Sequence, residues 1–152
     1  MIQVILLSCS LSCKMEFDFI QEHPQFKFTQ QKRFIQKAKQ LLKGEGFVKP
    51  LFLTTVFMTD PDLLVINKKH LNLNYFTDII TFPIEDVEDC LEAEIYMSID
   101  NIRENAIKYN TDFNSELLRV FLHGILHLVG YEDKTAPEQG VMRSKEDYYM
   151  NL

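Results

Sequence analysis

The sequence predicts a single α+β domain in which a buried helix packs against a small β-sheet. Three observations support this fold class. The chain has 152 residues, the size of one ordinary domain. Short β-branched and aromatic segments alternate with segments of helical spacing, and the chain ends in a run of helices. The segment at residues 114–129 is apolar on almost every side, which is typical of a helix buried in a core.

The first third of the chain predicts two strands and one helix. Residues 15–20 alternate enough between apolar and polar side chains to form a short strand. Thr29 can cap the helix that follows, and the glycines at 44 and 46 can end it. Residues 51–58 are β-branched and aromatic, so they predict a second strand. The high phenylalanine content, 12 residues, predicts an aromatic-rich core.

The middle of the chain predicts two short helices and two strands. An Asp-Pro-Asp sequence starts residues 60–69, with Asp60 as the cap and the proline in the first helical turn. Strands are expected at residues 77–82 and 94–98. Asp100 is then expected to cap a helix of about ten residues.

The C-terminal third predicts the buried helix and one further helix. Thr135-x-x-Glu138 matches a capping box that begins a last helix toward Tyr149. On that helix Arg143 and Glu146 are spaced to form a surface ion pair of minor importance. His23, in an N-terminal loop, is expected at the surface.

The charge balance limits the classes of partner. The net charge is -6 and the isoelectric point is about 5.2, which argues against a protein that binds duplex nucleic acid by bulk electrostatics. It leaves open an enzyme with a local basic groove. The three cysteines, Cys9, Cys13 and Cys90, form no CxxC pair, which is typical of a reducing compartment.

Residues 1–14 are predicted to be an extension of a metal-dependent domain at residues 15–152. The first charged side chain is Lys14, so the segment lacks the basic region of a secretory signal. Residues 6–9 faintly resemble a lipoprotein cleavage site. We expect instead a disordered tail, or translation that starts at Met15. No segment approaches the length of a transmembrane helix.

A thirteen-residue motif, from His123 to Thr135, predicts a metal site. His123 and His127 lie four residues apart, so a helix projects both imidazoles from one face. Gly130 can stop the helix with a left-handed turn, after which Asp133 can return toward the same ion. Glu132 is a rival third ligand. Two histidines, one carboxylate and a position left for water are the layout of a catalytic zinc centre.

Zinc is the first expectation for this ligand set, with Fe²⁺, Mn²⁺ or Ni²⁺ as alternatives. Two histidines on an apolar helix need partners, and a shared metal supplies one. Zinc peptidases place a glutamate, their general base, directly after the first histidine, where this chain has Gly124. This difference argues against peptide hydrolysis. RNA cleavage fits better, because the metal can steady charge on the phosphate oxygens while water or a 2′-hydroxyl attacks.

Three segments resemble one known family in order and spacing. His123-Gly-x-Leu-His127-Leu-x-Gly-Tyr is similar to the signature of the YbeY family of bacterial rRNA-maturation endoribonucleases. Residues 77–83, Thr-Asp-Ile-Ile-Thr-Phe-Pro, and residues 94–98, Glu-Ile-Tyr-Met-Ser, resemble two strands of that family. The resemblance covers roughly residues 60–146.

The resemblance implies a zincin-like α+β domain, with a small mixed β-sheet packed around a buried central helix. It implies one zinc ion, held by His123, His127 and Asp133. It further implies single-strand-specific cleavage of rRNA precursors, at the 16S 3′ end, in ribosome biogenesis. A cytoplasmic location, ribosomal components as partners and no membrane association follow from it. The oligomeric state stays open.

The chain departs from the family pattern at two positions. Asp133 stands where the family has a third histidine, which adds negative charge to the site. Leu71 stands where the family has an arginine thought to help bind or cleave RNA, and His70 beside it is a possible proton carrier. Four cationic side chains are candidates to replace that arginine: Lys68, Lys69, Lys134 and Arg143.

Two alternatives to the ribonuclease stay open. One is another metal-dependent hydrolase that acts on a small phosphoester or amide. The other is a ribosome-assembly factor whose metal is chiefly structural, which the acidic charge and the missing arginine favour. For two further side chains, Tyr131 and Glu94, two interpretations stay open. Tyr131 either positions phosphate or packs over the metal loop, and Glu94 either orients a ligand histidine or is a surface acid.

Overall fold

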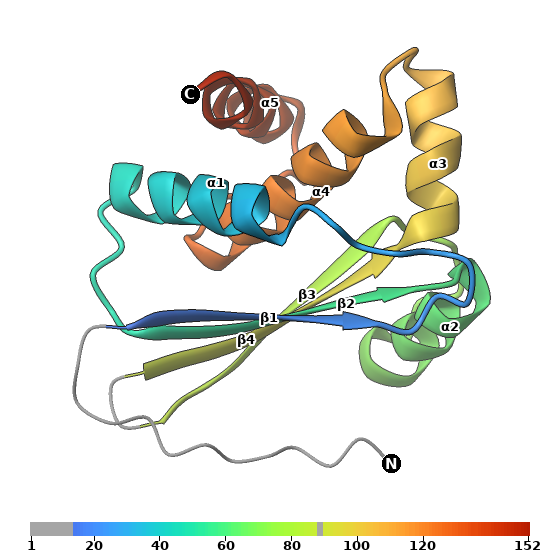
Figure 1. Cartoon of the computed structure of the whole chain (residues 1–152), viewed down its shortest axis with the longest axis horizontal. Helices are drawn as coiled ribbons and strands as arrows, with labels where there is room; N and C mark the ends of the chain where they lie inside the picture. The colour runs from blue at the N-terminus through green and yellow to red at the C-terminus, as the bar shows by residue number, and fades with distance from the viewer. Residues whose placement is uncertain (1–13, 88–89) are drawn as a thin grey trace.

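The computed structural model describes residues 14–87 and 90–152. They form one α+β unit, which confirms the expected fold class (Figure 1). The elements follow in this order: β1 Met15–Gln21, α1 Gln31–Gly44, β2 Leu51–Met58, α2 Asp60–Ile66, a π-helical turn η1 Asn67–Leu71, β3 Ile79–Val87, β4 Cys90–Ser98, α3 Ile99–Lys108, α4 Phe113–Leu128 and α5 Ala136–Asn151.

The four described strands form one mixed sheet in the order β1-β2-β4-β3. β1 pairs with β2 and β2 with β4 in parallel, whereas β3 runs antiparallel to β4. The parallel pairs need helical crossovers, which α1 supplies between β1 and β2. β3 therefore lies at an edge of the sheet, and its start follows directly on the loop after η1.

The sheet carries helices on both faces. α1 and α4 cover one face, with α5 outside them, and α2 lies against the other (Figure 1). The buried side chains of β2 accordingly point to both faces of the sheet. Its Leu53 and Phe57 join the large core under α1 and α4, and its Val56 and Met58 join a smaller core with Leu63 of α2.

Phenylalanine rings join the helices to the sheet, as the composition predicted. Phe34 of α1 and Phe121 of α4 are fully buried, with ring centroids 4.9 Å apart. Phe28 packs on Phe57 of β2 at 4.7 Å. These rings fix α4 between α1 and the sheet, so the histidine-bearing helix has little freedom to shift.

Two predicted helix caps, Asp60 and Asp100, are wrong by one and two residues respectively. Thr59 and Ser98 cap α2 and α3, because each stands at the last extended residue and accepts from the backbone of the first turn. Asp100 lies inside the first turn of α3 instead. There it accepts hydrogen bonds from the Asp60 backbone and the His23 imidazole, each at 3.0 Å.

Three further expectations concern the N-terminal part of the chain. His23 is not at the surface, since only 7% of it is exposed and its ring is held by Asp100. α1 begins one residue later than Thr29 would set, with Gln30 at the cap position and no side-chain cap bond. The extension predicted at residues 1–14 lies outside the described residues except for Lys14. In the described part of the chain, no helix is both long and apolar enough to cross a membrane.

Candidate metal centre

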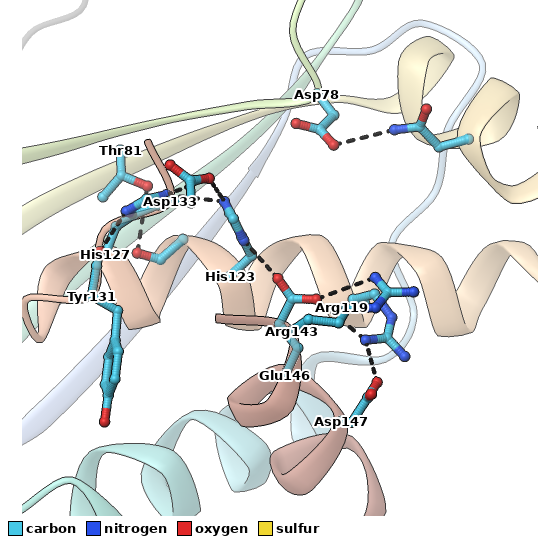
Figure 2. A network of polar contacts seen from close by, with 12 residues as sticks. Asp78, Thr81, Arg119, His123, His127, Tyr131, Asp133, Arg143, Glu146 and Asp147 are labelled. Carbon is cyan, nitrogen blue, oxygen red and sulfur yellow. Dashed lines mark hydrogen bonds and ion pairs between the residues drawn. The ribbon is translucent and has the colours of Figure 1, made fainter. Parts of the chain in front are cut away.

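The structure brings together the three side chains that the motif predicted as metal ligands. The Nε2 atoms of His123 and His127 lie 2.9 Å apart. Asp133 Oδ2 lies 3.3 Å from the first and 3.6 Å from the second. Among the described residues these three form a group able to hold a metal ion, with ligand atoms within 4.8 Å of one another. Figure 2 shows them converging on the side of α4 that faces β3.

The end of α4 explains how Asp133 reaches the histidines. The helix stops at Leu128, and Gly130 takes a left-handed backbone angle, φ 103°, which favours glycine. The amides of Gly130 and Tyr131 donate to the carbonyls of His127 and Leu126 at 3.1 and 3.0 Å. This closed turn reverses the chain within three residues. The carboxylate thereby returns beside the last turn of the helix that carries the imidazoles.

Hydrogen bonds behind the two imidazoles assign their tautomers. His127 Nδ1 lies 2.8 Å from the Tyr131 carbonyl oxygen, which can only accept, so Nδ1 carries the proton. His123 Nδ1 lies 2.7 Å from Glu146 Oε1, which assigns its proton in the same way. Both Nε2 atoms of the neutral rings are then acceptors, and they face each other and a carboxylate. Three converging acceptors at these distances fit a shared cation.

Glu146 is a buried acid at the core of the site, which corrects its expected place in a surface pair. It is only 6% exposed, and Arg119 and Arg143 lie 3.2 and 3.4 Å from its second oxygen (Figure 2). Burial favours a higher pKa of Glu146, but the contacts with His123 and Arg119 outweigh it and hold that pKa below its ordinary value.

The contact between Glu146 and His123 shifts the pKa of His123 in the opposite direction. Burial works to lower the pKa of the His123 imidazole. The hydrogen bond and the negative charge of Glu146 outweigh burial and raise that pKa above its ordinary value, with smaller contributions from Asp133 and Asp78. A carboxylate of this kind behind a ligand histidine also increases the basicity of the atom that faces the metal.

Gly124 leaves no room for a larger residue after the first histidine. A Cβ atom there would lie 2.6 Å from Ile79 Cδ1, 3.0 Å from Thr81 Oγ1 and 3.1 Å from Ile95 Cδ1. α4 packs directly on β3 and β4 at this point. The position that holds the general base in zinc peptidases is thus filled by the sheet itself.

The family profile described as Endoribonuclease YbeY matches residues 16–152, which include every described element except the first residue of β1. The chain belongs to the YbeY endoribonuclease family. One relative, the endoribonuclease YbeY of Cytophaga hutchinsonii, is 37% identical over 134 residues, covering 88% of this chain and 93% of the relative. The endoribonuclease YbeY of Karelsulcia muelleri is 42% identical over 108 residues, covering 71% and 74%.

A solved structure has a fold similar to that of this chain. The solution structure of the Thermotoga maritima protein TM1509 is similar to this chain with a TM-score of 0.60 and 28% sequence identity. The likeness covers 89% of this chain and 87% of that protein. The similarity in fold therefore extends over most of this chain.

Asp78, at the start of a YbeY-like strand, interacts electrostatically with His123, which was not predicted from the sequence. It stands just before β3, and its carboxylate accepts from Asn105 Nδ2 at 3.2 Å (Figure 2). Burial raises the pKa of Asp78, and the nearby His123 opposes that rise. The signal available in the sequence was its place at the start of a YbeY-like strand.

Three other candidate side chains make contacts outside the group formed by His123, His127 and Asp133. Glu132, the rival ligand, pairs with Lys134 at 3.3 Å and is exposed. His70 packs its ring on Phe82, with centroids 5.7 Å apart, and Glu94 accepts from a tyrosine hydroxyl on its own strand. Of the side chains proposed to help in catalysis, Arg143 contacts the group that orients His123, whereas His70 does not.

Proposed function

We propose that this chain is a zinc-dependent, single-strand-specific endoribonuclease that acts in 16S rRNA 3′-end maturation. The observation that carries the proposal is the convergence of His123, His127 and Asp133 in a member of a ribonuclease family. Ribosomal components are its proposed partners, and the cytoplasm is its proposed location.

Zinc suits the donor set, because two imidazole nitrogens and one carboxylate oxygen are typical zinc ligands and leave a coordination position open. A zinc ion bound there would polarise a phosphate oxygen and lower the pKa of a coordinated water molecule. The chain's own part is to hold three ligands in fixed orientation. Glu146 and the Tyr131 carbonyl do this for His123 and His127 respectively.

Asp78 is proposed to hold or release a proton during cleavage. Its raised pKa and its place on the strand side of the site suit a general acid or base. Gly124 cannot take this role, since a side chain at that position would collide with β3. The residue after the first histidine therefore offers no proton-transfer group in this chain.

Arg143 is proposed to contact the phosphate backbone in place of the family arginine. It is exposed, it lies on α5, and it reaches the Glu146 carboxylate behind His123 at 3.4 Å. Leu71, at the family arginine's position, is 44% exposed and carries no charge. A guanidinium can bind two phosphate oxygens at once.

A loop beside β3 supports the choice of single-stranded RNA. Tyr75 and Phe76 are 56% and 57% exposed, and the Asn67 side chain donates to the Tyr75 carbonyl at 2.9 Å. Asn67 is itself buried, so the loop backbone is fixed while its two rings face solvent. Exposed aromatic rings stack on unpaired bases, which a duplex does not offer.

Zinc content and RNA cleavage of the purified protein test the proposal. The wild type should hold one zinc ion and cut a single-stranded RNA faster than the matching duplex. Asp133→Ala should lose zinc and cleavage, whereas Glu132→Ala, a change at the neighbouring exposed acid, should keep both. Equal zinc content in the two variants would show that Asp133 is not a ligand.

The net charge of -6 favours one second candidate, a ribosome-assembly factor with a chiefly structural metal. His127→Ala separates the two functions. Under the main proposal this variant loses cleavage of single-stranded RNA. Under the second candidate the wild type binds RNA or ribosomal protein without cutting, and His127→Ala lowers thermal stability alone.

A further inference from the structure

Glu45 gathers three hydrogen-bond donors at a point remote from the metal ligands. It follows α1, and its side chain is only 10% exposed. Its Oε1 accepts from Lys145 Nζ at 2.7 Å and from the Tyr149 hydroxyl, both on α5. Its Oε2 accepts from the Tyr131 hydroxyl at 2.7 Å. One oxygen thus accepts hydrogen bonds from α5, and the other accepts from the loop that follows α4.

Tyr131 connects this carboxylate to the metal cluster. Its hydroxyl is held by Glu45, and its backbone carbonyl accepts from His127 Nδ1 at 2.8 Å. The Lys145 ammonium lies 5.3 Å from the centre of its ring, within the range of a cation–π contact. Glu45 therefore holds the hydroxyl of Tyr131, and His127 holds its backbone carbonyl.

Glu45 and the residues that contact it are closely packed. A Cβ atom on Gly44 would lie 2.5 Å from the Tyr149 hydroxyl oxygen. A side chain at this position would therefore displace the Tyr149 hydroxyl from its place beside Glu45. The pKa of Glu45 agrees with the geometry. Burial favours a higher value, but the bonds from Lys145, Tyr149 and Tyr131 together lower it.

We propose that Glu45 is a positioning residue for the metal centre, acting through Tyr131 on the His127 imidazole. With its hydroxyl fixed by Glu45, Tyr131 holds its carbonyl where His127 Nδ1 must donate. This sets the ring orientation that aims Nε2 at the metal, and it holds the turn that returns Asp133. The inference rests on the proposed metal binding by these residues.

The competing explanation is that Glu45 only joins α1 to α5 and stabilises the fold. The two oxygens of Glu45 allow a matched comparison. Tyr131→Phe and Tyr149→Phe each remove one phenolic hydroxyl from the same carboxylate. Only Tyr131→Phe frees the residue that touches His127, since Tyr149 bonds to the other oxygen.

The experiment measures zinc affinity by competition with a chromophoric chelator, and thermal unfolding of the metal-free protein. Tyr131→Phe should weaken zinc binding about tenfold, the lower end for groups that orient a ligand histidine. Tyr149→Phe should lower the melting temperature to a similar extent but leave zinc affinity within about twofold of wild type. Glu45→Ala should match Tyr131→Phe, and Glu45→Gln, which keeps an acceptor for the hydroxyl, should recover part of the loss.

Three results would be distinguishable failures. If the wild type and Tyr131→Phe bind zinc equally well while His127→Ala does not, the positioning role is wrong and the metal site stands. If Tyr149→Phe weakens zinc binding as much as Tyr131→Phe, Glu45 acts on the fold as a whole. If the wild type binds no zinc, the proposed function fails, and this inference fails with it.

Discussion

The Nδ1 atom of His123 lies 2.7 Å from the Oε1 atom of Glu146, so α5 holds a ligand histidine of α4 from behind. The other oxygen of Glu146 faces Arg119 of α4 and Arg143 of α5. The buried carboxylate is thereby compensated on both sides. The proposed metal centre therefore depends on the packing between these two helices, and a change on α5 should affect it.

Glu146→Gln should weaken zinc binding by about tenfold to a hundredfold, the range typical of groups that orient ligand histidines. The amide keeps a side chain of the same size but loses the negative charge that raises the pKa of His123. The measurement is competition with a chelator. Asp147→Asn is the control, because Asp147 also pairs with Arg119, at 2.7 Å, but is not among the partners of His123.

Gly124→Ala should destabilise the protein, whereas Gly140→Ala should stabilise it. At Gly124 the new methyl group meets three side chains of the sheet at 2.6 to 3.1 Å, and overpacking costs about 1–3 kcal/mol. The gain in helix propensity, about 1 kcal/mol, offsets part of that cost. At Gly140 of α5 nothing lies within 4 Å of the new methyl group, so the gain in helix propensity is not offset by overpacking. Urea unfolding of the two variants should give shifts of opposite sign.

The stability of the metal-free protein should fall in acid partly through Glu45. Its pKa in the folded protein lies below the ordinary value of 4.5. Its contribution is therefore fully present above that value and is lost as the pH falls through the lowered folded pKa. Glu45→Gln should be less stable than wild type at neutral pH, and the difference should vanish in stronger acid. Urea midpoints between pH 7 and pH 3 measure this, with the exposed Glu16→Gln as the control.

The local part of the site could be predicted from sequence because its geometry is local. The spacing of His123 and His127 on one helix, and a glycine turn before Asp133, fix the cluster within a few residues of each other. The capping box at Thr135 and Glu138 was predicted for the same reason and is confirmed.

The remote part of the site could not be predicted in this way. Glu146 looked like half of an i, i+3 surface pair, and only the packing of α5 on α4 buries it against His123. Glu45 had no sequence signal, since its partner Tyr131 is 86 residues away. The wrong helix caps have a different cause. Thr59 and Ser98 compete with nearby aspartates for the cap, and the end of the preceding strand decides between them.

The loop between η1 and β3 offers a direct test of the proposed substrate. Tyr75 and Phe76 are exposed on a backbone that the buried Asn67 side chain fixes. Base stacking on an aromatic ring is worth about 1–3 kcal/mol per base. Tyr75→Ala in the metal-free protein, which binds without cutting, should therefore weaken affinity for a short single-stranded RNA by at least about fivefold. Fluorescence anisotropy of a labelled oligonucleotide measures this.

Phe76→Trp should report the same contact from the protein side. The chain contains no tryptophan, so the new indole is its sole strong fluorophore. Stacking of an unpaired base on it should quench its emission on addition of single-stranded RNA, with a midpoint that matches the anisotropy titration. Tyr109→Trp is the control, because Tyr109 is 54% exposed at the end of α3 that points away from the sheet (Figure 1). Equal quenching at both positions, or stronger quenching by duplex than by single strand at position 76, would contradict the stacking role.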